Sequence, residues 1–287
     1  MSRPTDSLKS FLATNERTNP FRPRRGVLVV GSGKGGTGTS VVSSLLAQSA
    51  AIQGERVLLV DADESVGSLH YMFGLRDPGP GLGALRGGRV TPEQLVRSVT
   101  PSLFLLPGGG GGADATLSSA TAERRAMFQR VSDLYEQFGI VIVDGGSRLE
   151  SVMAACGAGV ERLLCVTGPG RISLAASYAL FKVARSRFEE LPVELLVNTA
   201  TDRAGQTLHA VVRQATQSFL ATDVHFGGAI PEDEELHRLI EAGEPLTRLA
   251  PNSAAVAAAG AIMGRLLAEQ ELLHLPDPSV LTLQPPS

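Results

Sequence analysis

A continuous apolar run at residues 26–31 (GVLVVG) leads into a glycine-rich loop, and residues 40–53 after it have the length and spacing of a helix. Continuous apolar runs rich in valine are typical of strands that are buried on both faces of a sheet. A buried strand followed directly by a helix is the first half of a βαβ unit, which is built on parallel strands. This feature restricts the chain to α/β folds.

The same alternation continues along the rest of the chain. Further apolar runs predict strands, and amphipathic stretches predict helices between them. The predicted strands after the first are residues 55–61, 103–107, 139–144, 162–168, 193–199 and 224–230, and the helices are 40–53, 118–137, 172–190, 204–220, 232–242 and 252–272. We therefore predict a doubly wound α/β fold with a mainly parallel sheet of about seven strands flanked by helices.

The 287 residues, 43% of them hydrophobic, can form one substantial core. We expect one domain at residues 25–273, a flexible basic arm at 1–24 and a proline-rich tail at 274–287. The net charge of −3 gives no general electrostatic reason to expect nucleic-acid binding. The basic arm is typical of a solvated tail, and it is also the best candidate for contact with a protein partner. The basic residues of the arm are Arg3, Lys9, Arg17, Arg22 and Arg24, and Arg25 follows the arm directly.

Several features predict a cytoplasmic protein. No apolar run reaches the roughly 18 residues that a membrane span requires, and the polar N-terminus does not resemble a signal peptide. Cys156 and Cys165 lie near or within apolar runs without metal-binding spacing, so we expect buried thiols. The alanine-rich helix at 252–272 lacks the basic flanks of an interfacial anchor and predicts a packing helix. Any association with the inner membrane would therefore be made through a partner.

The loop after the first strand matches a phosphate-binding pattern at every position except one. The pattern G-x-x-x-x-G-K-[ST] turns consecutive backbone amides toward phosphate oxygens at the N-terminus of a helix. Thr39 replaces the lysine, and Ser40 stands where a hydroxyl binds Mg²⁺. Glycine alone is common in tight turns, but here the loop joins a buried strand to a helix. The predicted nucleotide-binding residues are Gly33, Gly35, Gly36, Thr37, Gly38, Thr39 and Ser40.

Two aspartates end predicted strands, Asp61 after the second and Asp144 at the end of the fourth. The carboxyl ends of parallel strands meet at one edge of the sheet, which is where ligands bind in such folds. Each aspartate alone would also fit a helix or turn cap. Together with Ser40 and the loop, they predict a Mg²⁺ site and ATP as the nucleotide.

The segment GKGGTG at residues 33–38 resembles the deviant phosphate loop of the MinD/ParA ATPases. The resemblance covers most of residues 26–267. It implies that Lys34 reaches across an ATP-dependent homodimer to the nucleotide of the other subunit. It also implies that Asp63 positions the attacking water, which makes Lys34 and Asp63 the candidate catalytic residues. The alternative is that Lys34 is an ordinary exposed lysine without a functional role.

Further along the chain, the resemblance assigns residues to the nucleotide base. Asn198 falls where the family has its base-reading asparagine, although it also fits a turn residue. Pro231 and Glu232 belong to the segment AIPEDEEL, which is similar to the family's adenine loop. Within the family, this region most resembles the flagellar-number regulators (FlhG/FleN) and MinD.

The chain also departs from the family at several positions. Thr39 removes the cation that contacts the transferred phosphate, so we expect slow or absent hydrolysis. Gly145-Gly146-Ser147 and Gly170 also depart from the usual residues. Our first hypothesis is an ATP-binding regulator that dimerises on nucleotide and positions or counts a cell-surface machine such as a flagellum. The alternative is a hydrolysis-deficient scaffold with the same fold.

Overall fold

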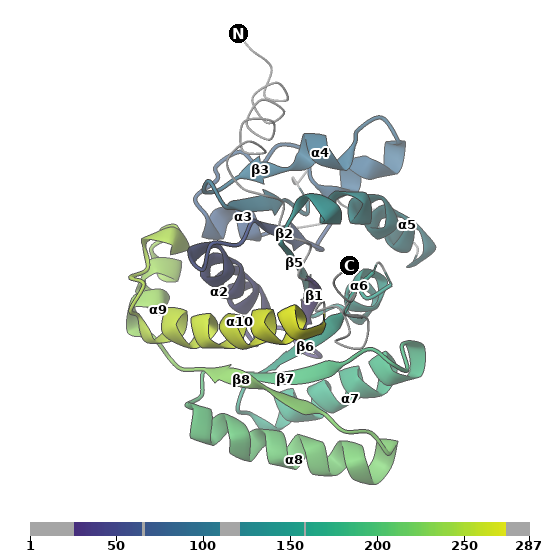
Figure 1. The fold of residues 1–287 in the computed structure, drawn as a ribbon, viewed down its shortest axis with the longest axis vertical. Coiled ribbons are helices and arrows are strands. Elements are labelled where there is room, and N and C mark those ends of the chain that lie inside the picture. The colour runs from purple at the N-terminus through teal and green to yellow at the C-terminus, as the bar shows by residue number, and fades with distance from the viewer. Residues whose placement is uncertain (1–25, 65–66, 110–120, 158, 274–287) are drawn as a thin grey trace, which may run out of the picture.

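The computed structural model describes residues 26–64, 67–109, 121–157 and 159–273, so the predicted arm (1–24) and tail (274–287) lie outside the described residues. Within these ranges the chain alternates between strands and helices, as the apolar pattern predicts (Figure 1). The strands are β1 (Gly26–Gly31), β2 (Val57–Asp61), β3 (Arg97–Ser98), β4 (Leu103–Leu106), β5 (Ile140–Gly146), β6 (Arg162–Thr167), β7 (Val193–Asn198) and β8 (His225–Ile230).

The strands form a single sheet in the order β3-β4-β2-β5-β1-β6-β7-β8. All neighbours pair in parallel except β3 and β4, which are antiparallel. The predicted fold class is therefore confirmed. The sheet has 8 strands because β3 adds an edge that the sequence does not reveal. At 2 residues, β3 is too short to show an apolar pattern.

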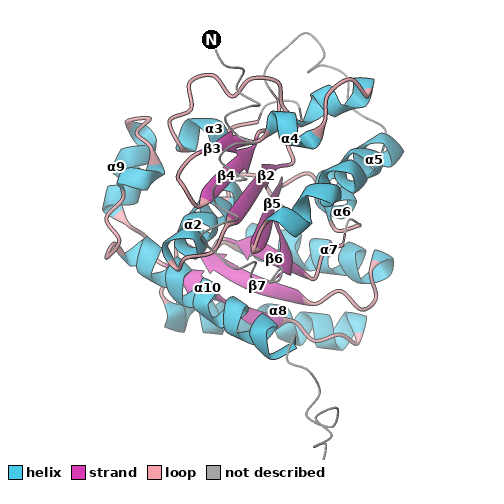
Figure 2. Ribbon diagram, turned by 45° about the horizontal axis from the view of Figure 1, so that its top comes forward, coloured by secondary structure: helices cyan, strands magenta, loops and turns pink. Residues whose placement is uncertain are grey.

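Helices cover both faces of the sheet (Figure 2). Alternate side chains of each strand enter separate cores; in β1, Val27 and Val29 join one core while Leu28 and Val30 join the other. One face carries α2 (Thr39–Ile52), α3 (Leu69–Met72), α9 (Glu234–Glu241) and α10 (Ala254–Leu273). The other carries η1 (Leu82–Gly87), α4 (Pro92–Leu95), α5 (Thr121–Val131), η3 (Ser132–Gln137), α6 (Leu149–Ala155), α7 (Arg171–Arg187) and α8 (Asp202–Leu220), while η4 (Leu246–Arg248) follows α9.

The helix at the end of the domain is a packing helix, as expected. α10 packs against α2 and β8, and its buried face includes Ala255, Ala259 and Met263. Among the helices of the described ranges, none combines the length and apolarity that crossing a membrane requires. Cys156 and Cys165 are buried and unbridged, and burial raises the pKa of each thiol to about 12.

Candidate functional site: a glycine loop facing two buried carboxylates

The loop between β1 and α2 depends on glycine at three positions. Gly36 and Gly38 have φ angles of +79° and +81°, a left-handed conformation that side-chain-bearing residues rarely adopt. A Cβ at Gly33 would lie 2.0 Å from the carbonyl oxygen of Ala176, so this glycine lets the loop contact α7 directly. The predicted phosphate-binding residues therefore form one compact turn that ends at the start of α2.

Thr39 occupies the position where the phosphate-binding pattern has lysine. Its side chain is buried, and its Oγ1 lies 3.1 Å from Oγ1 of Thr37. Ser40 follows at the start of α2 and shares a side-chain hydrogen bond with Asp144. The first turn of α2 thus offers hydroxyl groups and backbone amides, and α2 has no basic side chain.

Asp61 ends β2, and Asp144 lies two residues before the end of the neighbouring parallel strand β5, opposite Asp61 in the register. Both residues are buried, with exposed fractions of 2% and 3%. Burial, reinforced by the charge of Asp144, raises the pKa of Asp61 to about 7. Burial likewise raises the pKa of Asp144, although the hydrogen bond with Ser40 opposes this. Two adjacent buried carboxylates favour a bound cation, which would lower the cost of keeping both ionised.

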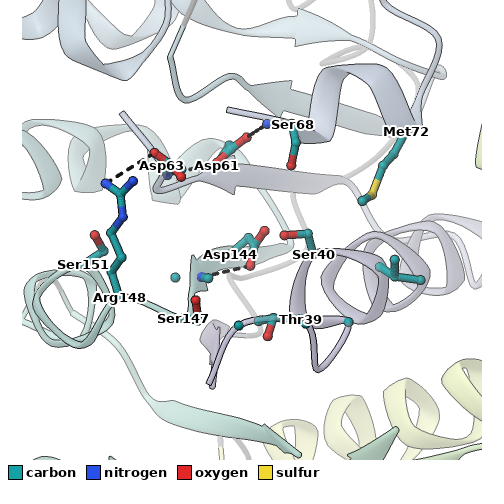
Figure 3. Close-up of a pocket in the computed structure, with 16 residues that line it drawn as sticks. Thr39, Ser40, Asp61, Asp63, Ser68, Met72, Asp144, Ser147, Arg148 and Ser151 are labelled. Atoms are coloured by element: carbon teal, nitrogen blue, oxygen red, sulfur yellow. Dashed lines mark hydrogen bonds and ion pairs between the residues drawn. The ribbon is translucent and has the colours of Figure 1, made fainter. Parts of the chain in front are cut away.

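A cavity of about 450 Å³ lies between the glycine loop and these carboxylates. Figure 3 shows Asp144 between Thr39 and Asp61, with Ser40 beside it. Oxygen donors of this kind suit Mg²⁺, and glycine amides at a helix N-terminus suit phosphate oxygens. The residues present therefore fit a magnesium-bound nucleotide. The lining residues are Gly35, Gly36, Gly38, Thr39, Ser40, Val41, Asp61, Asp63, Ser68, Met72, Asp144, Gly145, Gly146, Ser147, Arg148 and Ser151.

Lys34 lies outside the lining of this cavity. Its side chain is exposed, and its Nζ donates a hydrogen bond to the carbonyl oxygen of Gly35. An exposed lysine at the tip of the phosphate loop is placed to contact another molecule rather than a nucleotide in its own cavity. This position is compatible with the expected contact across a dimer, which stays a prediction.

Arg148 is a cavity residue that sequence reasoning missed. It immediately precedes α6, and its Nη1 lies 3.8 Å from Oδ1 of Asp63. Asp63 itself lines the cavity, and its predicted role in positioning the attacking water stays a prediction. The only sequence signal for Arg148 was its position four residues after Asp144, in the segment where the chain departs from the family pattern.

The residues predicted to contact the base lie at the same edge of the sheet but outside the cavity lining. Asn198 ends β7, and its Nδ2 donates a hydrogen bond to the carbonyl oxygen of Thr37 in the phosphate loop. Pro231 and Glu232 follow the end of β8. The next residue, Asp233, accepts hydrogen bonds from the first turns of α9 and α10 and has a structural role. Base contact by Asn198, Pro231 and Glu232 stays a prediction.

The sheet topology, the glycine loop that enters α2 and the two strand-end carboxylates together define a class, the P-loop nucleotide-binding fold. The profile of the CobQ/CobB/MinD/ParA nucleotide binding domain matches residues 28–246. The chain belongs to this family.

Two curated relatives are similar over most of their length. The flagellum site-determining protein YlxH of Helicobacter pylori is 26% identical over 246 residues, which cover 85% of this chain and 82% of the relative. The antiactivator FleN of Pseudomonas aeruginosa is 26% identical over 236 residues, which cover 80% of this chain and 81% of the relative. The predicted resemblance to the flagellar regulators is thus confirmed by sequence similarity over most of the chain.

A solved structure has the same fold. The septum site-determining protein MinD of Pyrococcus horikoshii, complexed with Mg-ADP, matches with a TM-score of 0.67 and 22% identity. The match covers 86% of this chain and 96% of the other. At this identity the likeness shows the fold alone.

Proposed function

We propose that this chain is an ATP-binding regulator that dimerises on nucleotide and positions or counts a cell-surface machine such as a flagellum. The observation that carries the proposal is the cavity in which the glycine loop faces Asp61 and Asp144. Its buried carboxylates favour a cation, and its loop favours phosphate. Magnesium-bound ATP supplies both.

In this proposal Ser40, Asp61 and Asp144 hold Mg²⁺, and the loop amides bind the phosphates. When bound, Mg²⁺ supplies positive charge that balances the phosphates and the carboxylates. Asn198, Pro231 and Glu232 contact the base, and Asp63 orients water. Support for the ligand comes from the MinD of Pyrococcus horikoshii, a protein of the same fold that was solved with Mg-ADP.

The regulatory role is supported by the names of two relatives, a flagellum site-determining protein and an antiactivator. In this role the protein works in the cytoplasm as a homodimer and reaches its machine, and any membrane, through a protein partner. The N-terminal arm is the segment we assign to that partner. Nucleic acid is not part of the proposal, because the formal net charge is −3.

Thr39 supports a second candidate, a scaffold that keeps the nucleotide site without turnover. A neutral hydroxyl cannot balance charge that develops on a transferred phosphoryl group, whereas backbone amides still bind the ground state. Both candidates share the nucleotide site, and they differ in whether nucleotide controls assembly.

Light scattering tests the proposal through the assembly state of the full chain, with and without Mg·ATP. We expect the nucleotide to shift the protein from monomer to dimer and Lys34→Ala to abolish the shift, because Lys34 is exposed beside the cavity. Lys182→Ala, which removes an exposed lysine from α7, is the matched control and should dimerise like the wild type. A dimer that forms without nucleotide and survives Lys34→Ala would overturn the proposal in favour of the scaffold.

A further inference from the structure

The lining of the cavity has an unequal charge balance. It includes three carboxylates, Asp61, Asp63 and Asp144, and the only basic side chain among the lining residues is that of Arg148. A nucleotide phosphate entering this cavity brings more negative charge. Mg²⁺ offsets part of that charge, but the phosphate loop adds only backbone amides and hydroxyls, because Thr39 stands where a lysine would lie.

Lys34, the neighbouring lysine, does not supply the missing positive charge to the cavity of its own subunit. Lys34 is exposed, donates to the carbonyl oxygen of Gly35 and is absent from the cavity lining. Of the basic residues that the structure describes near the phosphate loop, Arg148 is therefore the one whose side chain borders the space for a ligand.

The backbone of Arg148 is fixed at a useful place. Its carbonyl oxygen accepts hydrogen bonds from the amides of Ser151 and Val152 in the first turn of α6. From this point the side chain extends along the cavity toward Asp63 (Figure 3). A long side chain on a fixed backbone can move its guanidinium between acceptors without rearrangement of the fold.

The observed ion pair is of a kind that is easily exchanged. The Arg148 and Asp63 side chains are 53% and 38% exposed, and their closest charged atoms are 3.8 Å apart. Ion pairs between exposed side chains contribute about 0–1 kcal/mol, whereas a planar guanidinium binds phosphate oxygens through two parallel hydrogen bonds. A phosphate in the cavity would compete well with Asp63 for the guanidinium.

We propose that Arg148 is the cation that contacts phosphate in this cavity and that it replaces the binding contribution of the lysine missing at Thr39. Without nucleotide, Asp63 holds the guanidinium of Arg148. This inference rests on the proposed function, because it requires the cavity to bind a magnesium nucleotide. It assigns a role to a residue for which neither the family pattern nor the relatives' names provide one.

Isothermal titration of the full chain with Mg·AMPPNP and with Mg·ADP tests the inference through affinity alone, whether or not ATP is hydrolysed. Arg148→Ala should weaken binding of at least one of the two nucleotides roughly tenfold or more, the usual loss for a hydrogen bond to a charged group. Arg148→Lys keeps the charge but not the paired geometry, so it should recover part of that loss.

Arg213→Ala is the matched control. Arg213 is 48% exposed and is paired with Asp223 at 2.6 Å. It lies in α8 and pairs with a residue just before β8, toward the amino edge of the sheet and away from the cavity. This variant removes the same charge and should bind both nucleotides like the wild type.

Asp63→Asn should strengthen binding of Mg·AMPPNP severalfold, and the gain should shrink when Arg148 is already alanine, because the guanidinium is then no longer shared.

If the wild type binds nucleotide and Arg148→Ala binds both nucleotides as tightly as Arg213→Ala does, this inference is overturned and the proposed function stands. If the wild type binds neither nucleotide, both are overturned. Unchanged thermal unfolding of the Arg148 variants confirms that a measured loss is local.

Discussion

Buried carboxylates in two regions of this protein meet the same electrostatic problem in opposite ways. Glu64 and Glu194 each pair with two arginines, and their own side chains are 2% and 3% exposed. Asp61 and Asp144 are buried to a similar degree, yet no lysine or arginine in the described part of the chain forms an ion pair with either of them. The pairs are Glu64 with Arg86 and Arg124, and Glu194 with Arg162 and Arg265.

The difference separates charge that serves the fold from charge that serves a ligand. For the buried carboxylates Glu64 and Glu194, neither of which lines the cavity, the chain itself supplies the cations as arginine side chains. At the cavity, burial and the neighbouring carboxylate raise the pKa of Asp61 to about 7. A site in this state favours a cation from solution.

The largest effect is expected where an internal pair is broken. Arg124 Nε lies 2.9 Å from Glu64, and the Arg124 side chain is 6% exposed. Arg124→Met should lower the free energy of unfolding by about 3–5 kcal/mol, because the buried carboxylate loses a partner. Urea denaturation measures the change. Arg213→Ala breaks an exposed pair and should cost about 0–1 kcal/mol. Equal costs for the two variants would contradict the contrast.

The next effect comes from placing a lysine in the phosphate loop, at the position where Thr39 replaces it. Thr39→Lys should raise the rate of phosphate release from saturating Mg·ATP by about a hundredfold, the usual contribution of one donor that stabilises transition-state charge. Thr39→Met is the control, because the methionine side chain is similar in length to that of lysine but carries no charge. Brisk turnover by the wild type that Thr39→Lys does not improve would show that Thr39 is not the disabling change.

The smallest effect concerns the cation alone. At pH 8, above the pKa of about 7 for Asp61, millimolar Mg²⁺ should stabilise the protein against urea by about 1 kcal/mol, since it binds only the folded site. Asp144→Asn should abolish the gain, and Asp202→Asn, on the exposed start of α8, should retain it. Sodium chloride at the same ionic strength is the control for screening. An equal gain in Asp144→Asn would place the cation elsewhere.

The long elements of the fold were predictable because each carries its own pattern. The parallel strands begin and end within two residues of the predicted segments, although β7 (VELLVN) and β8 (HFGGAI) are not continuous apolar runs. The ends of the long helices differ from expectation by only a few residues. The missed elements are short. α3 and α4 have 4 residues each and α6 has 7, and these lengths show too little of a helical period to be recognised.

The candidate site was predictable where its residues follow from topology. The loop glycines are contiguous, and strand ends place Asp61 and Asp144 at one edge without any knowledge of side-chain contacts. Arg148 was not predictable, because its meaning depends on a cavity formed by three separate segments. The same is true of Glu64, whose arginine partners lie 22 and 60 residues away in the chain.

The two buried cysteines have a practical consequence for spectroscopy. Thiol-reactive probes attack the thiolate, and a thiol with a pKa of about 12 is almost wholly protonated near neutral pH. A single cysteine introduced on the surface would therefore be labelled selectively without removal of Cys156 or Cys165. Fluorophores or spin labels attached in this way can test the proposed dimer by reporting distances between its subunits in an otherwise unaltered protein.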